Sequence, residues 1–239
     1  MINIIVLISL YKSKKFSKLI VNNLNSQLTK PNLCVMVDDG YNEFDYIKKN
    51  LNKKIKLKII KNVSNLGHAQ SLNNGIRFIK QLNQKSIIFR LDKDDFWRNS
   101  HIKLNMEFLK RNKEVFMVTN YSKNFKKFIF DKYYIIDNPT IHSSWVINFN
   151  NNKDFRYLKK LPEDFATLSY FHRKGLKISN LNKNTVINNN TINSLSKKKS
   201  ANLDFFKIVT QNFFYSLRNK RYFVIVTFLL SLIRYLLRR

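Results

Sequence analysis

The 239-residue sequence has only one cysteine, Cys34, which limits the kind of protein it encodes. A single cysteine excludes a disulfide framework and a cysteine-ligated metal site, and it is typical of a reducing compartment. Residues 1–6 have neither a basic leader nor a small-residue cleavage site, so the sequence predicts no signal peptide. We therefore expect a cytoplasmic protein, with Cys34 in the hydrophobic core because it lies inside an apolar run.

Acidic residues are also scarce: 15 Asp and Glu stand against 44 Lys and Arg, which gives a formal net charge of +29. This charge predicts attraction to a polyanion, such as nucleic acid, an anionic membrane surface or a phosphorylated substrate. The abundance of Lys, Asn and Ile, as A+T-rich coding produces, is a compositional source for part of it. Nucleic acid is not an expected partner, because neither paired strand aromatics nor zinc-finger spacings occur. A hydrophobic fraction of 44% excludes a disordered chain.

Glycine is the third scarce residue, with four in the chain. Gly40, Gly67 and Gly75 all lie in the first half, each beside a polar group. Glycine is used where the backbone must turn or come close to another group, so these positions predict turns or a close approach to a ligand.

Apolar runs and helical spacings alternate along the first half of the chain. Short apolar, β-branched runs predict strands, and apolar residues that recur every three or four positions predict helices between them. The predicted strands are 3–9, 33–37, 55–60, 86–91 and 115–119, and the predicted helices are 14–28, 43–51, about 69–79 and one capped by Asn99 or Ser100. This order is typical of an α/β fold with a mostly parallel sheet flanked by helices.

Acidic residues follow two of the predicted strands. Asp-Asp-Gly at 38–40 follows the second strand, and Asp92, Asp94 and Asp95 follow the fourth. Ligands of open α/β sheets bind outside the carboxyl ends of the strands, so we expect both groups at one edge. Asp92 and Asp94 are two residues apart and point to the same face of an extended strand end, where they could share a hard metal ion with the phosphates of a ligand. A solvated acidic turn is the alternative.

The histidines carry no recognisable metal signature. His68, His101, His142 and His172 lie in different segments and lack the spacing of metal ligands. We expect them at surface or helix positions rather than at a metal site.

The second half of the chain has a weaker pattern. Residues 120–161 offer only a candidate strand at 143–149, and Pro162 then opens a predicted helix that Gly175 ends. Two further short strands are predicted at 176–178 and 185–187, and a polar linker at 194–200.

The C-terminal tail is aromatic and basic. It shows an apolar helix face over 203–217 and then an apolar run at 222–237. That run is shorter than the roughly 20 residues of a spanning helix, contains Arg234 and has basic residues on both sides. We favour a basic amphipathic helix in the interface of an anionic membrane; a spanning segment and a buried or dimer-forming helix are the alternatives.

Together these motifs resemble those of family 2 glycosyltransferases, whose catalytic domain has the Rossmann-like A-type fold. The matching stretches occur in the family's order: Val-Asp-Asp-Gly at 37–40, Asn-Leu-Gly and Leu-Asn-Asn-Gly within 65–75, Leu-Asp-Lys-Asp-Asp at 91–95 and Pro-Glu-Asp-Phe at 162–165. The resemblance covers residues 2 to about 200. The chain departs from the family pattern at 9–12, where Pro-Val-Tyr-Asn is usual, at Tyr41, and at 186–190, where a Tyr-Arg-x-His element is usual.

The resemblance implies a donor site and a metal site. Asp38 is expected to read the nucleotide base, although a turn-capping aspartate is the alternative. Asp92 and Asp94, with Asp95 in support, are expected to hold Mn²⁺ or Mg²⁺ against the diphosphate. The other residues expected to contact the donor are Tyr11, Asp39, Asn65, Gly67, Asn73 and Arg173.

The resemblance also implies a catalytic base. Asp164 is expected to deprotonate the acceptor, with Glu163 as the alternate, in a single displacement that inverts the anomeric configuration. A simpler interpretation remains, because the helix dipole favours acidic residues in a first turn whatever their chemistry.

We therefore expect a metal-dependent inverting glycosyltransferase that moves a sugar from a nucleotide donor, with a UDP-sugar favoured, to a glycan or glycolipid acceptor. Its place would be the inner face of the membrane, in polysaccharide or lipopolysaccharide synthesis. The expected domains are a catalytic domain at 1–200, with a nucleotide-sugar half at 1–119 and an acceptor half at 120–200, and a membrane-associating tail at 201–239 that is also a candidate oligomer contact. The alternatives are a polyprenyl-phosphate glycosyltransferase and a non-catalytic basic binding protein on a degenerate transferase fold.

Overall fold

The chain divides into two compact units. The computed structural model describes residues 2–40, 44–120, 138, 140–160, 162–187 and 203–219. The first unit comprises Met1–Asn120, Ile141–Tyr157 and Lys177–Asn189, and the second comprises Tyr121–Thr140, Leu158–Leu176 and Asn190–Arg239. The domain boundaries predicted after residues 119 and 200 stay predictions, because a contact unit need not coincide with a functional half.

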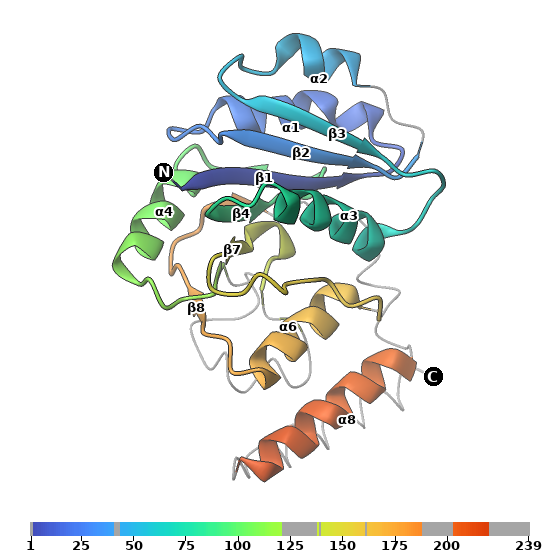
Figure 1. Ribbon diagram of the computed structural model, residues 1–239, viewed down its shortest axis with the longest axis vertical. Helices are drawn as coiled ribbons and strands as arrows, with labels where there is room; N and C mark the ends of the chain where they lie inside the picture. Colours follow the sequence, from blue (N-terminus) through green and yellow to red (C-terminus); the bar gives the residue numbers. More distant parts are fainter. Residues whose placement is uncertain are drawn as a thin grey trace. The chain divides into compact units, whose positions relative to one another are not determined.

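The described part of the first unit is built on a seven-stranded sheet with the order β3-β2-β1-β4-β7-β6-β8 (Figure 1). Its strands are β1 (Asn3–Leu10), β2 (Leu33–Asp38), β3 (Lys56–Lys61), β4 (Ser86–Arg90), β6 (Met117–Thr119), β7 (Val146–Asn148) and β8 (Ile178–Asn180). Neighbours from β3 to β4 are parallel, as are β6 and β8, whereas β7 is antiparallel to both β4 and β6. The predicted α/β fold with a mostly parallel sheet is confirmed.

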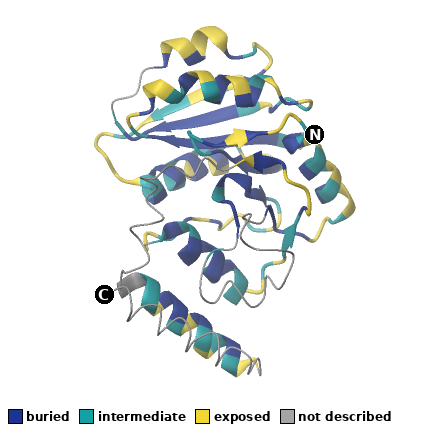
Figure 2. Ribbon diagram, turned by 180° about the vertical axis from the view of Figure 1, so that it is seen from behind, coloured by how far each residue is buried: buried dark blue, intermediate teal, exposed yellow. Residues whose placement is uncertain are grey.

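Helices flank this sheet, and the alternation of side chains along β1 explains how. Ile4, Val6 and Ile8 point to the face where they join the core that includes α1 and α4 residues, whereas Leu7 points to α3. The inner strands β1, β2, β4, β6 and β7 are therefore buried, whereas the edge strands β3 and β8 are partly exposed. The outer surfaces of the helices are exposed (Figure 2). The helical segments are η1 (Lys14–Phe16), α1 (Ser17–Asn25), α2 (Asp45–Asn50), α3 (His68–Gln81) and α4 (His101–Arg111).

The glycines serve turns and close packing. Gly40 and Gly67 have φ angles of 122° and 82°, which favour glycine; Gly40 is in the bend after β2 and Gly67 is the N-cap of α3. Gly75 lies on the face of α3 that contacts β1 and β2. A Cβ atom there would collide with the Leu7 side chain and lie 3.1 Å from Val37 Cγ2, so the helix can approach the sheet only because this position is glycine.

A short strand pair was not fully predicted. β5 (Phe96–Trp97) pairs antiparallel with β9 (Val186–Ile187), and only the second of them was expected. Trp97 is fully buried, its backbone N–H donates to Asn23 Oδ1 at 2.8 Å, and its indole N–H donates to the carbonyl of Ser143 at 2.9 Å. Two residues are too few for any periodicity, so this strand depends on tertiary contacts.

The second unit contains α6 (Glu163–Arg173) and α8 (Leu203–Arg218). Their buried side chains form a small core of Phe165, Ala166, Ile208 and Val209. Pro162 precedes α6, and Gly175, with a φ of 68°, follows it, as predicted. The residues of the expected linker at 194–200, the apolar run at 222–237 and Tyr41 lie outside the described residues. Within the described residues, none of the helices is long and apolar enough to cross a membrane.

Candidate active site

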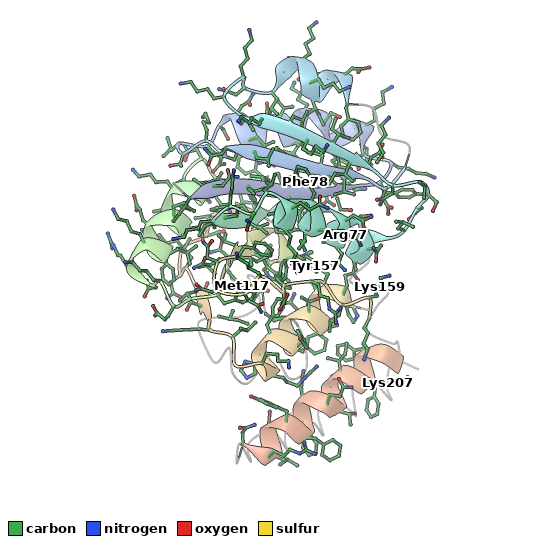
Figure 3. All side chains as sticks on the ribbon, in the orientation of Figure 1. Arg77, Phe78, Met117, Tyr157, Lys159 and Lys207 are labelled. Atoms are coloured by element: carbon green, nitrogen blue, oxygen red, sulfur yellow. The ribbon has the colours of Figure 1, made fainter. Side chains whose placement is uncertain are left out.

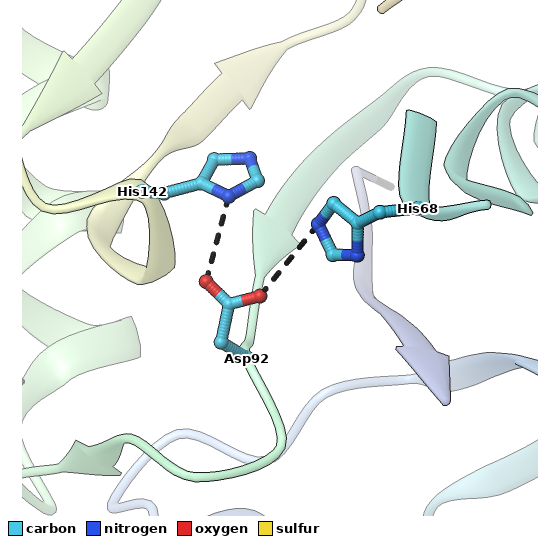
Figure 4. A group of neighbouring side chains, drawn as sticks. All are labelled: His68, Asp92 and His142. Carbon is cyan, nitrogen blue, oxygen red and sulfur yellow. Dashed lines mark ion pairs between the residues drawn. The ribbon is translucent and has the colours of Figure 1, made fainter. Parts of the chain in front are cut away.

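Asp92 lies two residues after the end of β4 and contacts three residues with positive or ionisable side chains. Its carboxylate contacts Arg90 Nη2, with Oδ1 at 3.8 Å from His68 Nε2 and Oδ2 at 3.4 Å from His142 Nδ1 (Figure 4). His68 begins α3, whereas His142 begins the 3₁₀ helix η2 (His142–Ser144) immediately before β7. The ligand atoms of Asp92, His68 and His142 lie within 4.8 Å of one another. We refer to these three residues as the His-Asp-His cluster.

Arg90 supplies a fully buried positive charge to this cluster. Its Nη1 donates to the carbonyls of Leu7, at 3.2 Å, and Leu91, while its Nη2 donates to Asp92 and lies 3.0 Å from His68 Nε2. Burial raises the pKa of Asp92, but the Arg90 guanidinium, followed by His142 and His68 when their rings are protonated, outweighs this and holds the pKa well below its usual value. Asp92 is therefore ionised.

The neighbouring acids Asp94 and Asp95 are the other predicted metal ligands, and their role stays a prediction. Burial, and then the charge of Asp92, raise the pKa of Asp94. The charge of Asp92 thus opposes the ionisation of Asp94, and a cation close to both would relieve this opposition. Asp95 is buried, and its carbonyl accepts a hydrogen bond from Asn23 Nδ2 at 2.8 Å, which fixes the backbone of the acidic turn. An ion held by Asp92 and Asp94 would neutralise negative charge on a leaving group.

Lys93 connects the acidic turn to the end of β1. Its Nζ donates to the carbonyl of Tyr11 at 2.8 Å and lies 5.7 Å from the centre of the Phe16 ring. The ring of Tyr11 in turn lies beside Gly40. Tyr11, the 38–40 turn and the acidic turn are therefore brought to one edge of the sheet, where the two acidic turns were predicted because each follows a strand. The donor contact of Tyr11 stays a prediction.

Asp38 and Asp39 have different partners. Asp38 Oδ1 accepts a hydrogen bond from the backbone N–H of Gly40 at 3.0 Å, which is the turn-capping geometry. Asp39 holds the loop after β3: its Oδ1 accepts from Leu66 N at 2.7 Å and its Oδ2 from Gly67 N at 2.9 Å. Asn65 belongs to the same loop, where its Oδ1 also accepts from Gly67 N. These contacts order the loop, and the donor contacts expected of these residues stay predictions.

Asn73 uses its side chain within the protein. Its amide exchanges two hydrogen bonds with the backbone of Tyr157 (labelled in Figure 3). The Tyr157 hydroxyl lies 3.1 Å from His142 Nε2, so Asn73 is linked through Tyr157 to the His-Asp-His cluster. A direct donor contact of Asn73 stays a prediction.

The metal-ligand geometry of two histidines is the feature that sequence reasoning missed. All four histidines lie in helical segments, as expected, and His101 is fully buried. We did not expect His68 and His142 to converge with Asp92 in a possible metal-binding group. They come from distant segments, so no local spacing signals them. The nearest available signal is that His68 directly follows the Asn-Leu-Gly motif.

The predicted catalytic base lies in the second unit, at the start of α6. Asp164 Oδ2 accepts a hydrogen bond from Asn138 Nδ2 at 3.0 Å, and its Oδ1 accepts from the N–H of Phe165 at 2.9 Å. Glu163 is buried, and Arg173 at the other end of α6 donates to Asn212 of α8. The catalytic role of Asp164, its alternate Glu163 and the donor contact of Arg173 stay predictions.

Comparison with solved structures places this fold among glycosyltransferases. The chain matches residues 1–349 of TarS from S. aureus, crystallised with UDP-GlcNAc, with a TM-score of 0.66 and 18% identity, covering 90% of this chain and 67% of that chain. It also matches the mannosyltransferase PcManGT from Pyrobaculum calidifontis, in complex with GDP-Man and Mn²⁺, with a TM-score of 0.65 and 14% identity, covering 90% and 64%. The chain thus spans about two thirds of these two chains, and 40% of the chain in another crystal structure of TarS.

Sequence comparison identifies the family. A search of curated protein sequences finds no significant match. The family model described as glycosyl transferase family 2 matches residues 5–178, which is most of the chain and contains both acidic turns and the start of α6. The predicted family and the predicted class of enzyme are therefore confirmed: the chain belongs to glycosyl transferase family 2.

Proposed function

We propose that the protein is a metal-dependent inverting glycosyltransferase that transfers a sugar from a nucleoside diphosphate, with UDP favoured, to a glycan or lipid-linked acceptor. The observation that carries this proposal is the pair of carboxylates Asp92 and Asp94 at the carboxyl edge of the sheet, in a chain of family 2. Similar folds were crystallised with UDP-GlcNAc and with GDP-Man and Mn²⁺, which supports a nucleotide-sugar donor.

Glycosyl transfer needs a group that stabilises the negative charge of the departing diphosphate and a base that deprotonates the acceptor hydroxyl. Asp92 and Asp94 would hold a divalent ion, which would stabilise the negative charge of the departing diphosphate. Asp164 takes the proton of the acceptor hydroxyl, and the oxygen attacks the anomeric carbon on the face opposite the nucleotide. The bonds from Asn138 and the Phe165 N–H support this role, because they fix the carboxylate in one orientation.

The test of the donor site is calorimetry with UDP, GDP and CMP, each with and without Mn²⁺. We expect metal-dependent UDP binding that Asp94→Asn weakens and Asp154→Asn leaves unchanged, since the Asp154 side chain is 99% exposed. Asp164→Asn should keep UDP binding and lose sugar transfer. Wild-type protein that binds none of the nucleotides would overturn the proposal and favour a binding protein on the same fold.

The lipid-linked acceptor is part of the proposal because the chain is strongly basic and ends in an apolar, basic tail. Attraction to anionic headgroups would place the enzyme at the membrane surface. Deleting residues 220–239 is the suitable test, because it keeps α8 and with it the buried Ile208 and Val209. We expect the truncated chain to float less with phosphatidylglycerol vesicles than the full chain does, while neither binds phosphatidylcholine vesicles. Equal flotation would assign the attraction to the basic body.

A further inference from the structure

The His-Asp-His cluster offers two imidazole nitrogens and a carboxylate as metal ligands, and so differs from a site made of carboxylates alone. We propose that His68 and His142 bind the divalent ion together with Asp92, so that the site selects a transition ion such as Mn²⁺ or Co²⁺ over Mg²⁺. This inference rests on the proposed function, because it concerns the ion that assists departure of the diphosphate.

The distances suit one shared ion. Imidazole nitrogens and carboxylate oxygens lie about 2.0–2.2 Å from such ions, so two ligands of one ion are at most about 4.4 Å apart. The two pairs that include Asp92 are separated by 3.4 Å, to His142 Nδ1, and 3.8 Å, to His68 Nε2. Both pairs, which involve the two different oxygens of Asp92, satisfy this limit. The ligand atoms of the three residues lie within 4.8 Å of one another, so a shared ion would require them to approach by at most about 0.4 Å.

His68 presents the nitrogen form that a metal needs. Its Nε2 lies 3.0 Å from Arg90 Nη2, and a guanidinium nitrogen can only donate a hydrogen bond. Nε2 of His68 therefore carries a lone pair directed into the cluster. An ion bound by this lone pair and by Asp92 would displace Arg90 Nη2 from both of them, while Arg90 Nη1 keeps its bonds to the carbonyls of Leu7 and Leu91.

His142 has the outer partner that ligating histidines usually have. Its Nδ1 points to Asp92, and its Nε2 lies 3.1 Å from the hydroxyl of Tyr157. A histidine that binds a metal through one nitrogen commonly donates its other N–H to an acceptor, which fixes the ring. Tyr157 can take this role because its ring stacks on Trp145 and its backbone forms two hydrogen bonds with the side chain of Asn73, one donated and one accepted.

The chemical type of the ligands determines which metal ion the site prefers. Imidazole ligands favour transition ions, whereas carboxylate and water ligands suit Mg²⁺ and Ca²⁺. A site of Asp92, Asp94 and Asp95 alone would be all-oxygen and would show little of this preference. The positive charges of Arg90 and Lys93 also oppose the bound ion, so we expect tighter metal binding when the negative charge of a nucleoside diphosphate is present.

The test measures metal binding directly, on the full chain. Mn²⁺, Co²⁺ and Mg²⁺ are titrated by calorimetry with and without UDP, and pulsed electron paramagnetic resonance of bound Mn²⁺ reports ¹⁴N coupling from imidazole. The variants are His68→Ala, His142→Ala and the matched control His172→Ala, which lies on α6 of the second unit. His142→Gln is a second substitution at position 142, for use if His142→Ala does not fold. Circular dichroism checks that each variant folds.

We expect ¹⁴N coupling in the wild type and in His172→Ala, and Mn²⁺ affinity at least about tenfold above that for Mg²⁺. Each cluster variant should lower Mn²⁺ affinity by at least about tenfold, since even loss of an outer partner costs about 10–100-fold. Bound Mn²⁺ without ¹⁴N coupling, with unchanged affinity in both cluster variants, would overturn the inference and leave the proposed function standing. A ¹⁴N-coupled ion in a protein that binds no nucleotide would support the inference and overturn the function.

Discussion

The side chain of Asn73 forms hydrogen bonds with both backbone groups of Tyr157. The Asn73 Nδ2 donates to the carbonyl of Tyr157 at 2.9 Å, and Oδ1 accepts from the Tyr157 N–H at 2.8 Å. One side chain thus satisfies both backbone groups of a buried residue, as a neighbouring strand would. The contact fastens α3 to the segment that supports His142.

Replacing Asn73 tests this link. Asn73→Ala leaves both backbone groups of Tyr157 without their partner, so we expect a loss of about 1–3 kcal/mol in the free energy of unfolding, measured in urea. Gln70→Ala on the same helix is the control, because it removes a single side-chain bond to Asn74. Mn²⁺ affinity should fall in Asn73→Ala and stay constant in Gln70→Ala. A stability change no larger than that of the control would contradict the proposed link.

The Arg90–Asp92 pair should be strongly coupled. Arg90 is fully buried, so removing either partner leaves the other charge poorly compensated. A double-mutant cycle with Arg90→Met and Asp92→Asn is expected to give a coupling energy of about 1–3 kcal/mol in urea unfolding. The exposed pair Lys80–Asp154 provides the control cycle, for which we expect no measurable coupling. Equal results in the two cycles would show that burial adds nothing to the pair.

His101 should make stability depend on pH. Burial lowers the pKa of His101 from 6.5 to about 3, and its Nδ1 lies 2.8 Å from Thr185 Oγ1 while its ring packs on Trp97. Because the folded pKa is below the unfolded one, the stabilisation is fully present above pH 6.5 and is lost as the pH falls from 6.5 towards 3. The expected slope from this residue is about 1.4 kcal/mol per pH unit.

Urea unfolding between pH 7.5 and 5 measures that slope. His101→Phe should remove this contribution, whereas His172→Gln should retain it. If the wild type and His101→Phe lose stability in parallel as the pH falls, the charge on His101 is not the cause.

Gly75 should resist substitution although it lies inside a helix. Alanine favours helix by about 1 kcal/mol over glycine, but the added Cβ would press on Leu7 and Val37. Overpacking of this kind costs about 1–3 kcal/mol, so we expect Gly75→Ala to be neutral or destabilising by thermal and urea unfolding. Arg77→Ala, on the exposed side of α3 (Figure 3), is the control and should be neutral or stabilising. A clear gain of stability in Gly75→Ala would show that the packing between α3 and the sheet accommodates the added methyl group, and would contradict this prediction.

Much of the fold could be predicted from the sequence because its signals are local. Alternation of apolar runs and helical spacings identified the strands and helices of the first half, and Pro162 and Gly175 marked the ends of α6. Other features could not be predicted from local patterns. The antiparallel insertion of β7 beside β4 and the two-residue β5 depend on which strands pair, and periodicity does not encode pairing.

The candidate site also has features that the sequence predicts and features that depend on the tertiary structure. The sequence by itself determined that acidic turns follow two strands, and the rule for parallel strands placed them at one edge. Only the tertiary structure decided what surrounds Asp92. His68 comes from the start of α3 and His142 from the segment before β7, and they meet because β7 lies next to β4 and α3 packs against β1 and β2. Such contacts between distant segments follow from strand order and packing, which residue spacing along the chain does not record.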